Sequence, residues 1–186
     1  METLEQFKQK FFDLPSRVFG ETYVEPILRK VLNHSSHEGS EYDAVQDGKR
    51  IEYKAVRVVF TAKKLKKSLM YDRVLSNSHM SERIGTLRDI ADGKIVANCQ
   101  NIKLDEFDVL VYVLVDNDGF HIFRAKTEMF IDGVFPNWCP NHGSKEKGKN
   151  GQFPIKGDNI DWHIKNCYPQ TLCWDDVLKL SKEIKF

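Results

Sequence analysis

Hydrophobic positions recur with helical spacing in three parts of the chain. Residues 4–12 and 172–184 each place their apolar side chains on one side of a helix. The pattern over 18–32 is also helical, and Pro26 within it must kink that helix or start a new one. The apolar positions that define these faces are Leu4, Phe7, Phe11, Phe12, Val18, Phe19, Val24, Ile27, Leu28, Val31, Leu32, Val177, Leu178 and Ile184.

Strand patterns occupy the region between these helices. Residues 40–45 and 49–59 predict two strands around Gln46-Asp47-Gly48, because an Asp-Gly pair is a strong hairpin signal. The run 105–115 is apolar on both faces, which predicts a central strand in a sheet covered on both sides. Further expectations are a polar loop at 34–39, a lysine-rich helix near 62–70, helix plus loop over 71–94, strands at 95–102, 120–124 and 160–164, a helical turn at 127–131 and a long irregular segment over 137–159.

Length and composition favour one compact domain spanning residues 1–186, of the α/β class. The longest apolar stretch, 109–115, is too short to cross a bilayer, and the acidic N-terminus lacks a signal-peptide core. We therefore expect a cytoplasmic protein with no membrane partner. Its four cysteines are then expected to be buried thiols or metal ligands and not disulfides.

The formal net charge of +1 hides an uneven distribution. From Arg57 to Arg88 there are eight basic and two acidic residues, a net of +6, and residues 144–156 add a net of +3. The rest of the chain must then sum to −8, since 1 − 6 − 3 = −8. Two basic segments on an otherwise acidic body indicate one side that faces phosphates.

The pattern that carries chemistry lies in the predicted hairpin. Glu52 and Lys54 are two residues apart on a strand and therefore share a face, and the turn brings Asp43 towards Glu52. Two adjacent carboxylates repel each other unless positive charge lies between them. A hard divalent ion such as Mg²⁺ supplies it, and a lysine beside the ion can polarise water and offset phosphoryl charge.

The order Asp43, Glu52-Tyr53-Lys54 resembles the PD-(D/E)XK nuclease superfamily, which includes most type II restriction endonucleases. Tyr42 replaces the proline that often precedes the first acid, a position that varies widely in the family. The resemblance covers roughly residues 15–125. It implies a restriction-endonuclease-like fold, with a mixed central β-sheet flanked by helices.

The resemblance also implies a site and a reaction. Asp43, Glu52 and the Tyr53 carbonyl would hold Mg²⁺, for which Mn²⁺ can substitute, during in-line hydrolysis of a phosphodiester in double-stranded DNA. Such nucleases often carry a further glutamate on the preceding helix. Glu21 is the first choice for it and Glu25 the second, four residues apart on one helix face.

The length and character of the chain resemble the small catalytic subunit of a heterodimeric type IIS restriction enzyme. Sequence-specific cleavage needs contacts to base edges, and the sequence shows neither a helix-turn-helix signature nor a clear zinc finger. A larger recognition subunit is therefore expected as partner. The alternatives are a homodimeric restriction enzyme, a structure-specific repair nuclease, and a non-enzymatic DNA-binding or interaction module.

A second group of residues offers a different reading. Cys139 and His142, followed by His163 and Cys167, have local spacings found at zinc sites, although packing in a core accounts for them as well. His142 and His163, with Asn150 or Asn159 between them, also faintly resemble the His-Asn-His metal nucleases.

Overall fold

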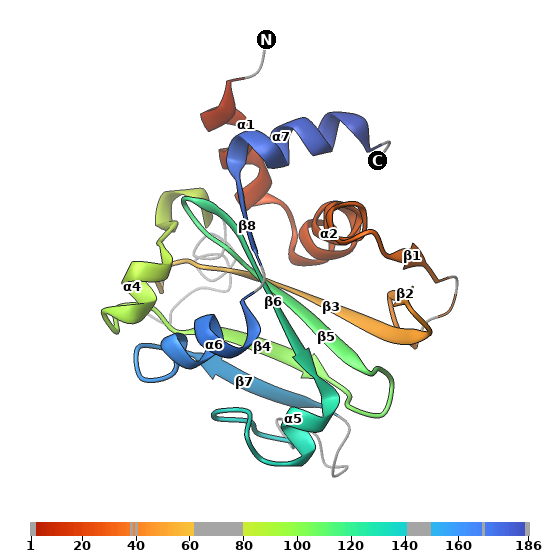
Figure 1. Ribbon diagram of the computed structural model, residues 1–186. Coiled ribbons are helices and arrows are strands. Elements are labelled where there is room, and N and C mark those ends of the chain that lie inside the picture. The colour runs from red at the N-terminus through yellow and green to blue at the C-terminus, as the bar shows by residue number, and fades with distance from the viewer. Residues whose placement is uncertain are drawn as a thin grey trace, which may run out of the picture.

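The computed structural model describes residues 3–37, 39, 41–61, 80–140, 150–168 and 170–184, and it places six strands in one mixed sheet (Figure 1). Their order is β1-β2-β3-β5-β6-β8; β3 and β5 are parallel, and each other neighbouring pair is antiparallel. The strands are β1 (Ser35–Ser36), β2 (Ala44–Gln46), β3 (Lys49–Arg57), β5 (Val109–Val115), β6 (Gly119–Lys126) and β8 (Gln170–Cys173). A separate antiparallel pair consists of β4 (Ala97–Ile102) and β7 (Gly151–Ile155).

Helices cover the sheet on both sides, so the predicted α/β architecture with a mixed, helix-flanked sheet is confirmed. In Figure 1, α1, α2 and α7 lie on one side, and α4, α5, α6 and the β4–β7 pair lie on the other. The helices are α1 (Leu4–Asp13), the π-helix η1 (Val18–Val24), α2 (Glu25–Leu32), the 3₁₀ helix η2 (Met80–Arg83), α4 (Leu87–Ala91), α5 (Thr127–Ile131), α6 (Ile160–Cys167) and α7 (Trp174–Glu183).

All seven residues of β5 are buried, which confirms the expectation of a central strand covered on both faces. Leu110, Tyr112 and Leu114 belong to the core beneath α6 and the β4–β7 pair. The alternate valines at 109, 111, 113 and 115 belong to the core beneath α1, α2 and α7. The sheet thus separates two hydrophobic cores, and strand alternation decides which of them each side chain of β3 faces.

The β2–β3 hairpin forms around the predicted Asp-Gly turn. Asp47 and Gly48 have φ angles of 52° and 74°, the left-handed conformation that both central residues of a type I′ turn require. Ala44 pairs with Ile51, and Gln46 pairs with Lys49. The parallel neighbour is tied to β3 by Asp108, whose carboxylate accepts hydrogen bonds from the backbone N–H of Arg50 at 2.8 Å and from its guanidinium at 2.9 Å.

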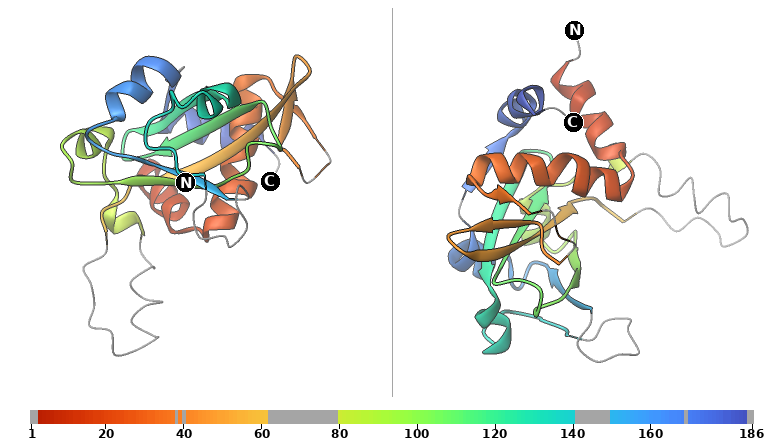
Figure 2. Two further views of the ribbon diagram at one scale, coloured as in Figure 1. Left: turned by 90° about the horizontal axis from the view of Figure 1, so that it is seen from below. Right: turned by 90° about the vertical axis from the view of Figure 1, so that its right-hand side faces the viewer.

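The N-terminal helices follow the predicted pattern, except that the first part of the predicted helix 18–32 is the π-helix η1. Thr3 and Gln6 form a capping box that starts α1, and Phe11 packs against Trp174 of α7 with ring centroids 5.4 Å apart. After Pro15-Ser16, η1 leads directly into α2, with Pro26 in the first turn of α2. The right-hand view in Figure 2 shows η1 and α2 as one continuous helix across the sheet.

Several predicted elements differ in the structure. Residues 160–164 form part of α6 and not a strand, because Ile160, His163 and Cys167 recur at helical spacing on its buried side. The segment predicted as irregular contains β7, and the predicted loop at 34–39 contains β1. Residues 170–173 form β8 before α7 begins. The predicted lysine-rich helix near 62–70 lies outside the described residues, as do 71–79 of the mixed segment.

The described helices are all too short or too polar to cross a membrane.

Gly119 allows the close approach of β6 and β8. Its φ is 146°, and a Cβ atom there would lie 2.0 Å from the Leu172 carbonyl oxygen, which belongs to the backbone and cannot move aside cheaply. We expect Gly119→Ala to lower the free energy of unfolding in urea by about 3 kcal/mol or more. Gly133→Ala is the control, because Gly133 has a φ of 70° with open space around it, and should cost only about 1–2 kcal/mol. Equal losses in the two variants would contradict this account.

Candidate active site

The structure brings Glu52 and Lys54 together on the face predicted from the sequence. Ile51 and Tyr53 are buried in the core beneath α2, so the alternate residues Glu52 and Lys54 face the opposite side of β3. They lie beside Leu110 and Tyr112 of β5, with which they pair in register. Charged side chains at these two positions therefore border a hydrophobic core and not open water.

Asp43 lies directly before β2, where its backbone N–H donates to the Ile51 carbonyl at 2.9 Å. Its carboxylate accepts a hydrogen bond of 2.7 Å from the backbone N–H of Tyr53. The first acid of the predicted pattern is therefore fixed to the middle of the Glu52-Tyr53-Lys54 segment. Because the N–H and C=O of a strand residue point to the same side, the Tyr53 carbonyl faces the strand edge at which Asp43 lies.

The Lys54 ammonium forms a hydrogen-bonded ion pair with Glu52. The two side chains are only 23% and 15% exposed, respectively, so both charges are largely withdrawn from water. Burial alone would lower the pKa of Lys54, but the charge and hydrogen bond of Glu52, with the charge of Asp43, outweigh it and raise that pKa. Lys54 is thus held as a cation.

Burial and two neighbouring charges determine the pKa of the Glu52 carboxylate. Burial raises the pKa of Glu52, the positive charge of Lys54 opposes this, and the negative charge of Asp43 adds to it. On the buried side, Cys99 of β4 is fully enclosed, and its pKa rises to about 12 through burial. This neutral thiol adds no charge, and the positive charge that lowers the pKa of Glu52 is that of Lys54.

Of the two candidate helix glutamates, Glu25 is partly buried and lies close enough to Asp43 and Lys54 for their charges to shift its pKa. The pKa of Glu25 is raised to about 7, first by burial and then by the charge of Asp43, against the lowering effect of Arg29 and Lys54, and Glu21 adds a smaller raising effect. Its carboxyl therefore lies within the field of Asp43 and Lys54. Glu21, the first choice from the sequence, has a 56% exposed side chain that pairs with Arg17 at 2.7 Å. The helix places them differently because Glu21 lies inside η1, whereas Glu25 begins α2.

Buried His34, which the sequence pattern did not reveal, contacts the Tyr53 side chain on the face opposite Glu52 and Lys54. The phenol oxygen of Tyr53 lies 2.7 Å from His34 Nδ1, and the two rings stack with centroids 5.9 Å apart. Burial lowers the pKa of His34, and the charge of Arg124 lowers it further, which favours the neutral imidazole. Tyr53 is therefore fixed at both its backbone and its side chain. The sequence carries no signal of this His34–Tyr53 contact, because it forms only when the residues after α2 pack against β3.

The donor set at this site fits a hard divalent cation in its chemistry. Carboxylate and carbonyl oxygens are the ligands that Mg²⁺ prefers. Asp43 and the Tyr53 carbonyl lie at one edge of β3, and the Glu52 side chain projects from a face of the same strand. Burial is the main cause of the raised pKa values of Glu25 and Glu52, and the negative charge of Asp43 raises both further. Within the described ranges no three acidic, histidine or cysteine side chains converge as a ligand group, and Lys54 serves as counter-ion to Glu52.

The cysteine and histidine residues that suggested zinc are separated or enclosed. All four cysteines are free thiols, and Cys139 is exposed beside β7, while Cys167 is buried in α6. His163 is fully buried, with its Nδ1 2.7 Å from the phenol oxygen of Tyr112, and burial lowers its pKa to about 4. Asn159 uses its side chain to close the loop before α6, accepting from the Lys156 N–H at 2.8 Å. His142 lies outside the described residues, whereas Asn150 is described directly before β7.

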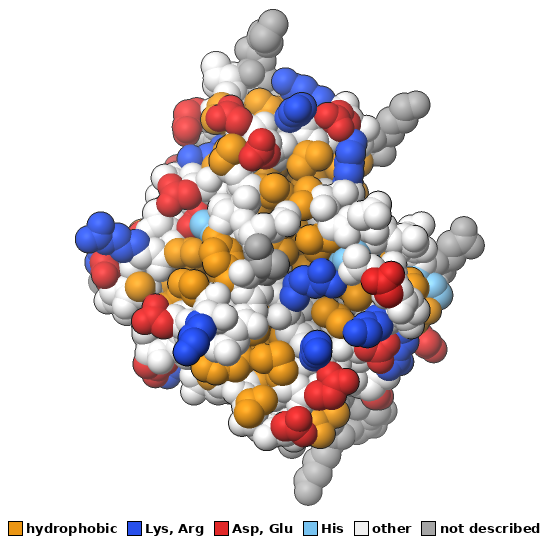
Figure 3. All heavy atoms as spheres, in the orientation of Figure 1, with side chains coloured by type: hydrophobic (Ala, Val, Ile, Leu, Met, Phe, Trp, Pro, Cys, Tyr) orange, Lys and Arg blue, Asp and Glu red, His pale blue; other side chains and the backbone are white. Residues whose placement is uncertain are grey.

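The prediction of one basic side concerns two segments that the structure describes only in part. Acidic and basic side chains alternate over the face shown in Figure 3, without a large area of one sign. Most of the basic residues of 57–88 and all of 144–149 lie outside the described residues. Of those described, Arg57 packs over the Phe19 ring at 3.9 Å, and burial lowers its pKa to about 10. It contributes to packing more than to a free phosphate-facing surface.

The chain matches no family model, and no curated protein or solved structure is significantly similar to it.

The raised pKa of Glu25 makes stability depend on pH. Folded chains keep this proton up to about pH 7, while the ordinary pKa is 4.5, so the folded state binds more protons between these values and its stability falls as pH rises. We expect Glu25→Gln to match the wild type near pH 4.5 and to exceed it by on the order of 2 kcal/mol at pH 8 in urea denaturation.

Glu21→Gln is the matched control for this measurement. It removes a carboxylate one helical turn away that is exposed and paired with Arg17, so its effect should stay within about 0.5 kcal/mol at both pH values. A Glu25→Gln curve parallel to that of the wild type across the range would show that the folded chain does not raise the pKa of Glu25.

Proposed function

We propose that the chain is a Mg²⁺-dependent endodeoxyribonuclease of the PD-(D/E)XK type that hydrolyses DNA phosphodiesters. The observation that carries the proposal is the half-buried Lys54–Glu52 ion pair in the same hairpin as Asp43, whose carboxylate accepts a hydrogen bond from the backbone N–H of the intervening residue Tyr53. These are the three residues that the sequence resemblance assigned to the site. The hairpin followed by a parallel, doubly covered strand also agrees with the fold that the resemblance implies.

Each residue has a role that follows from its surroundings. Asp43 and Glu52, with the Tyr53 carbonyl, would hold the cation, and Glu25, whose pKa is raised to about 7, would add negative charge once it loses its proton. The bound Mg²⁺ would supply charge stabilisation and an acidified water. Lys54 remains protonated next to Glu52, so its ammonium can orient that water and offset charge that develops on the phosphoryl oxygens.

The partner expected for such a chain follows from its surface and size. Acidic and basic side chains are interspersed on the face in Figure 3, and the formal net charge is only +1. Tight binding to DNA by one chain usually rests on a clear basic excess. We therefore propose that it is the small catalytic subunit of a heterodimeric type IIS restriction enzyme, which cuts one strand and relies on a larger subunit for sequence recognition.

The nuclease is tested by plasmid nicking with Mg²⁺, with the chain alone and together with any large restriction subunit that is encoded beside it. Lys54→Ala and Glu52→Ala should each lower the nicking rate at least about 100-fold, because the first removes the positive charge that offsets charge on the phosphoryl oxygens and the second removes a ligand of the cation. The control is Lys165→Ala, which removes an exposed lysine of α6. Circular dichroism should show that all three variants fold.

Nicking that requires the partner and disappears in both site variants would support a catalytic subunit. Site-specific cleavage by the isolated chain would instead favour a homodimeric enzyme. Activity that survives both substitutions would overturn the assigned site and direct attention to His142 and His163.

A metal titration separates the nuclease from a non-enzymatic interaction module. Mn²⁺ should bind weakly to the wild type, as detected by electron paramagnetic resonance, and Asp43→Asn should weaken this binding about tenfold or more, since it removes one charged ligand. Glu41→Gln is the control, because Glu41 is an exposed acid two residues away. Equal binding by wild type and Asp43→Asn would exclude Asp43 as a ligand.

A further inference from the structure

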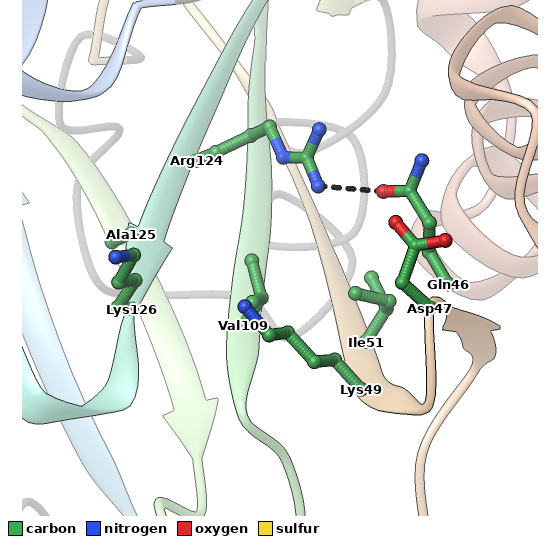
Figure 4. A pocket seen from close by; sticks show the side chains of 8 residues that line it. All are labelled: Gln46, Asp47, Lys49, Ile51, Val109, Arg124, Ala125 and Lys126. Carbon is green, nitrogen blue, oxygen red and sulfur yellow. Dashed lines mark hydrogen bonds between the residues drawn. The ribbon is translucent and has the colours of Figure 1, made fainter.

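A cavity of about 240 Å³ lies over the end of the sheet, on the face opposite Glu52 and Lys54. Its floor is apolar and includes Ile51 of β3 and Val109 of β5. Its polar lining comes from the β2–β3 turn and from the last residues of β6. Figure 4 shows these side chains, which come from β2, β3, β5, β6 and the β2–β3 turn, around one hollow.

Three of the lining residues are basic: Lys49, Arg124 and Lys126. Asp47 is the one carboxylate among the residues that line the hollow, so the lining has a formal charge of +2. Asp108 lies close enough to feel the charge of Lys49, but its carboxylate is already held by Arg50. In the described part of the chain, neither Lys49 nor Lys126 forms an ion pair.

Arg124 is the central group of this cavity. Its guanidinium donates to the side-chain oxygen of Gln46 at 2.8 Å, the contact marked in Figure 4, and no carboxylate of the described residues lies within ion-pair distance of it. A guanidinium has five N–H donors in one plane, so most of them stay available. The neutral side chain of Gln46 fixes the orientation of the guanidinium but leaves its positive charge in place. An oriented, charged guanidinium is what a carboxylate or phosphate ligand binds.

The surroundings of Arg124 contain a neutral histidine and little solvent to screen the charge of the guanidinium. His34 lies within its field, and burial first, then the charge of Arg124, lowers the pKa of His34. The imidazole therefore stays neutral near pH 7 and adds no competing positive or negative charge. Partial burial of the Arg124 side chain and the apolar floor reduce solvent screening, which strengthens attraction for an anion.

We propose that this cavity is a phosphate-binding site, with Arg124 as the oriented fork and Lys49 and Lys126 as flanking charges. The phosphate is either free, as inorganic phosphate or a nucleotide, or part of a nucleic acid backbone. The site is separate from Asp43, Glu52 and Lys54, so it can be tested without divalent metal and whether or not the chain cleaves DNA.

The experiment follows the Arg124 side-chain Nε–H signal in ¹H–¹⁵N NMR spectra of the full chain, assigned by its loss in Arg124→Gln. One titration uses inorganic phosphate at constant ionic strength, with chloride as the reference anion, and a second uses a 16-base-pair DNA duplex. We expect phosphate to shift the signal at concentrations where chloride does not. Lys126→Gln should weaken phosphate binding severalfold, and Arg124→Gln roughly tenfold as judged from neighbouring backbone signals.

The two titrations distinguish the source of the phosphate. If the ligand is a DNA backbone, the duplex shifts the same signal, phosphate competes with it, and Lys126→Gln lowers the salt dependence of duplex binding by about one unit of slope. If the ligand is free, only inorganic phosphate shifts the signal. Lys165→Gln is the control for loss of one exposed positive charge elsewhere.

Lys49→Gln and Lys126→Gln keep the Arg124–Gln46 bond, so the test does not depend on Arg124→Gln folding well. An Arg124 signal unmoved by both phosphate and duplex, with binding by both lysine variants equal to that of the wild type, would overturn the proposal. Loss of nicking in Glu52→Ala with an intact phosphate response would show that the two sites are independent.

Discussion

The burial of β5 on both faces is the constraint on which the rest of this structure depends. An all-apolar strand must be covered twice, so α1, α2 and α7 gather on one side and α6 with the β4–β7 pair on the other. The parallel neighbour β3 then lies between the same two cores, and its side chains must alternate between them. That alternation commits Ile51 and Tyr53 to one core and forces Glu52 and Lys54 into the border of the other.

Much of this arrangement could be predicted because it depends on local sequence. The Asp-Gly turn, the alternation along β3 and the apolar run of β5 each leave a pattern that can be read without tertiary contacts. They suffice to place Asp43 beside the Glu52-Tyr53-Lys54 segment. The bond from the Tyr53 N–H to Asp43 then completes, through a side chain, a strand edge that β2 is too short to cover.

What could not be predicted depends on packing between distant segments. Residues 160–164 alternate in polarity like a strand, yet α6 forms because Ile160, His163 and Cys167 fill the core around Tyr112. β1, β7 and β8 are short, and each exists only because a partner strand is adjacent. The choice between Glu21 and Glu25 was open for the same reason, since residues four apart on a regular helix share one face.

The π-helix η1 changes that geometry in a way that sequence spacing does not convey. Its backbone bond from the Glu25 N–H reaches the Gly20 carbonyl, five residues back, so one more residue is accommodated in the turn than in an α-helix. Each residue of an α-helix corresponds to a rotation of about 100°. Deleting one residue from 18–24 would therefore let the helix relax to regular winding and rotate everything before Glu25 relative to the sheet. The extra residue therefore sets the rotation of the residues before Glu25 relative to those that follow. The aromatic side chains of the N-terminal segment can then pack on their neighbours while the Glu25 carboxyl lies in a different environment on the same continuous helix.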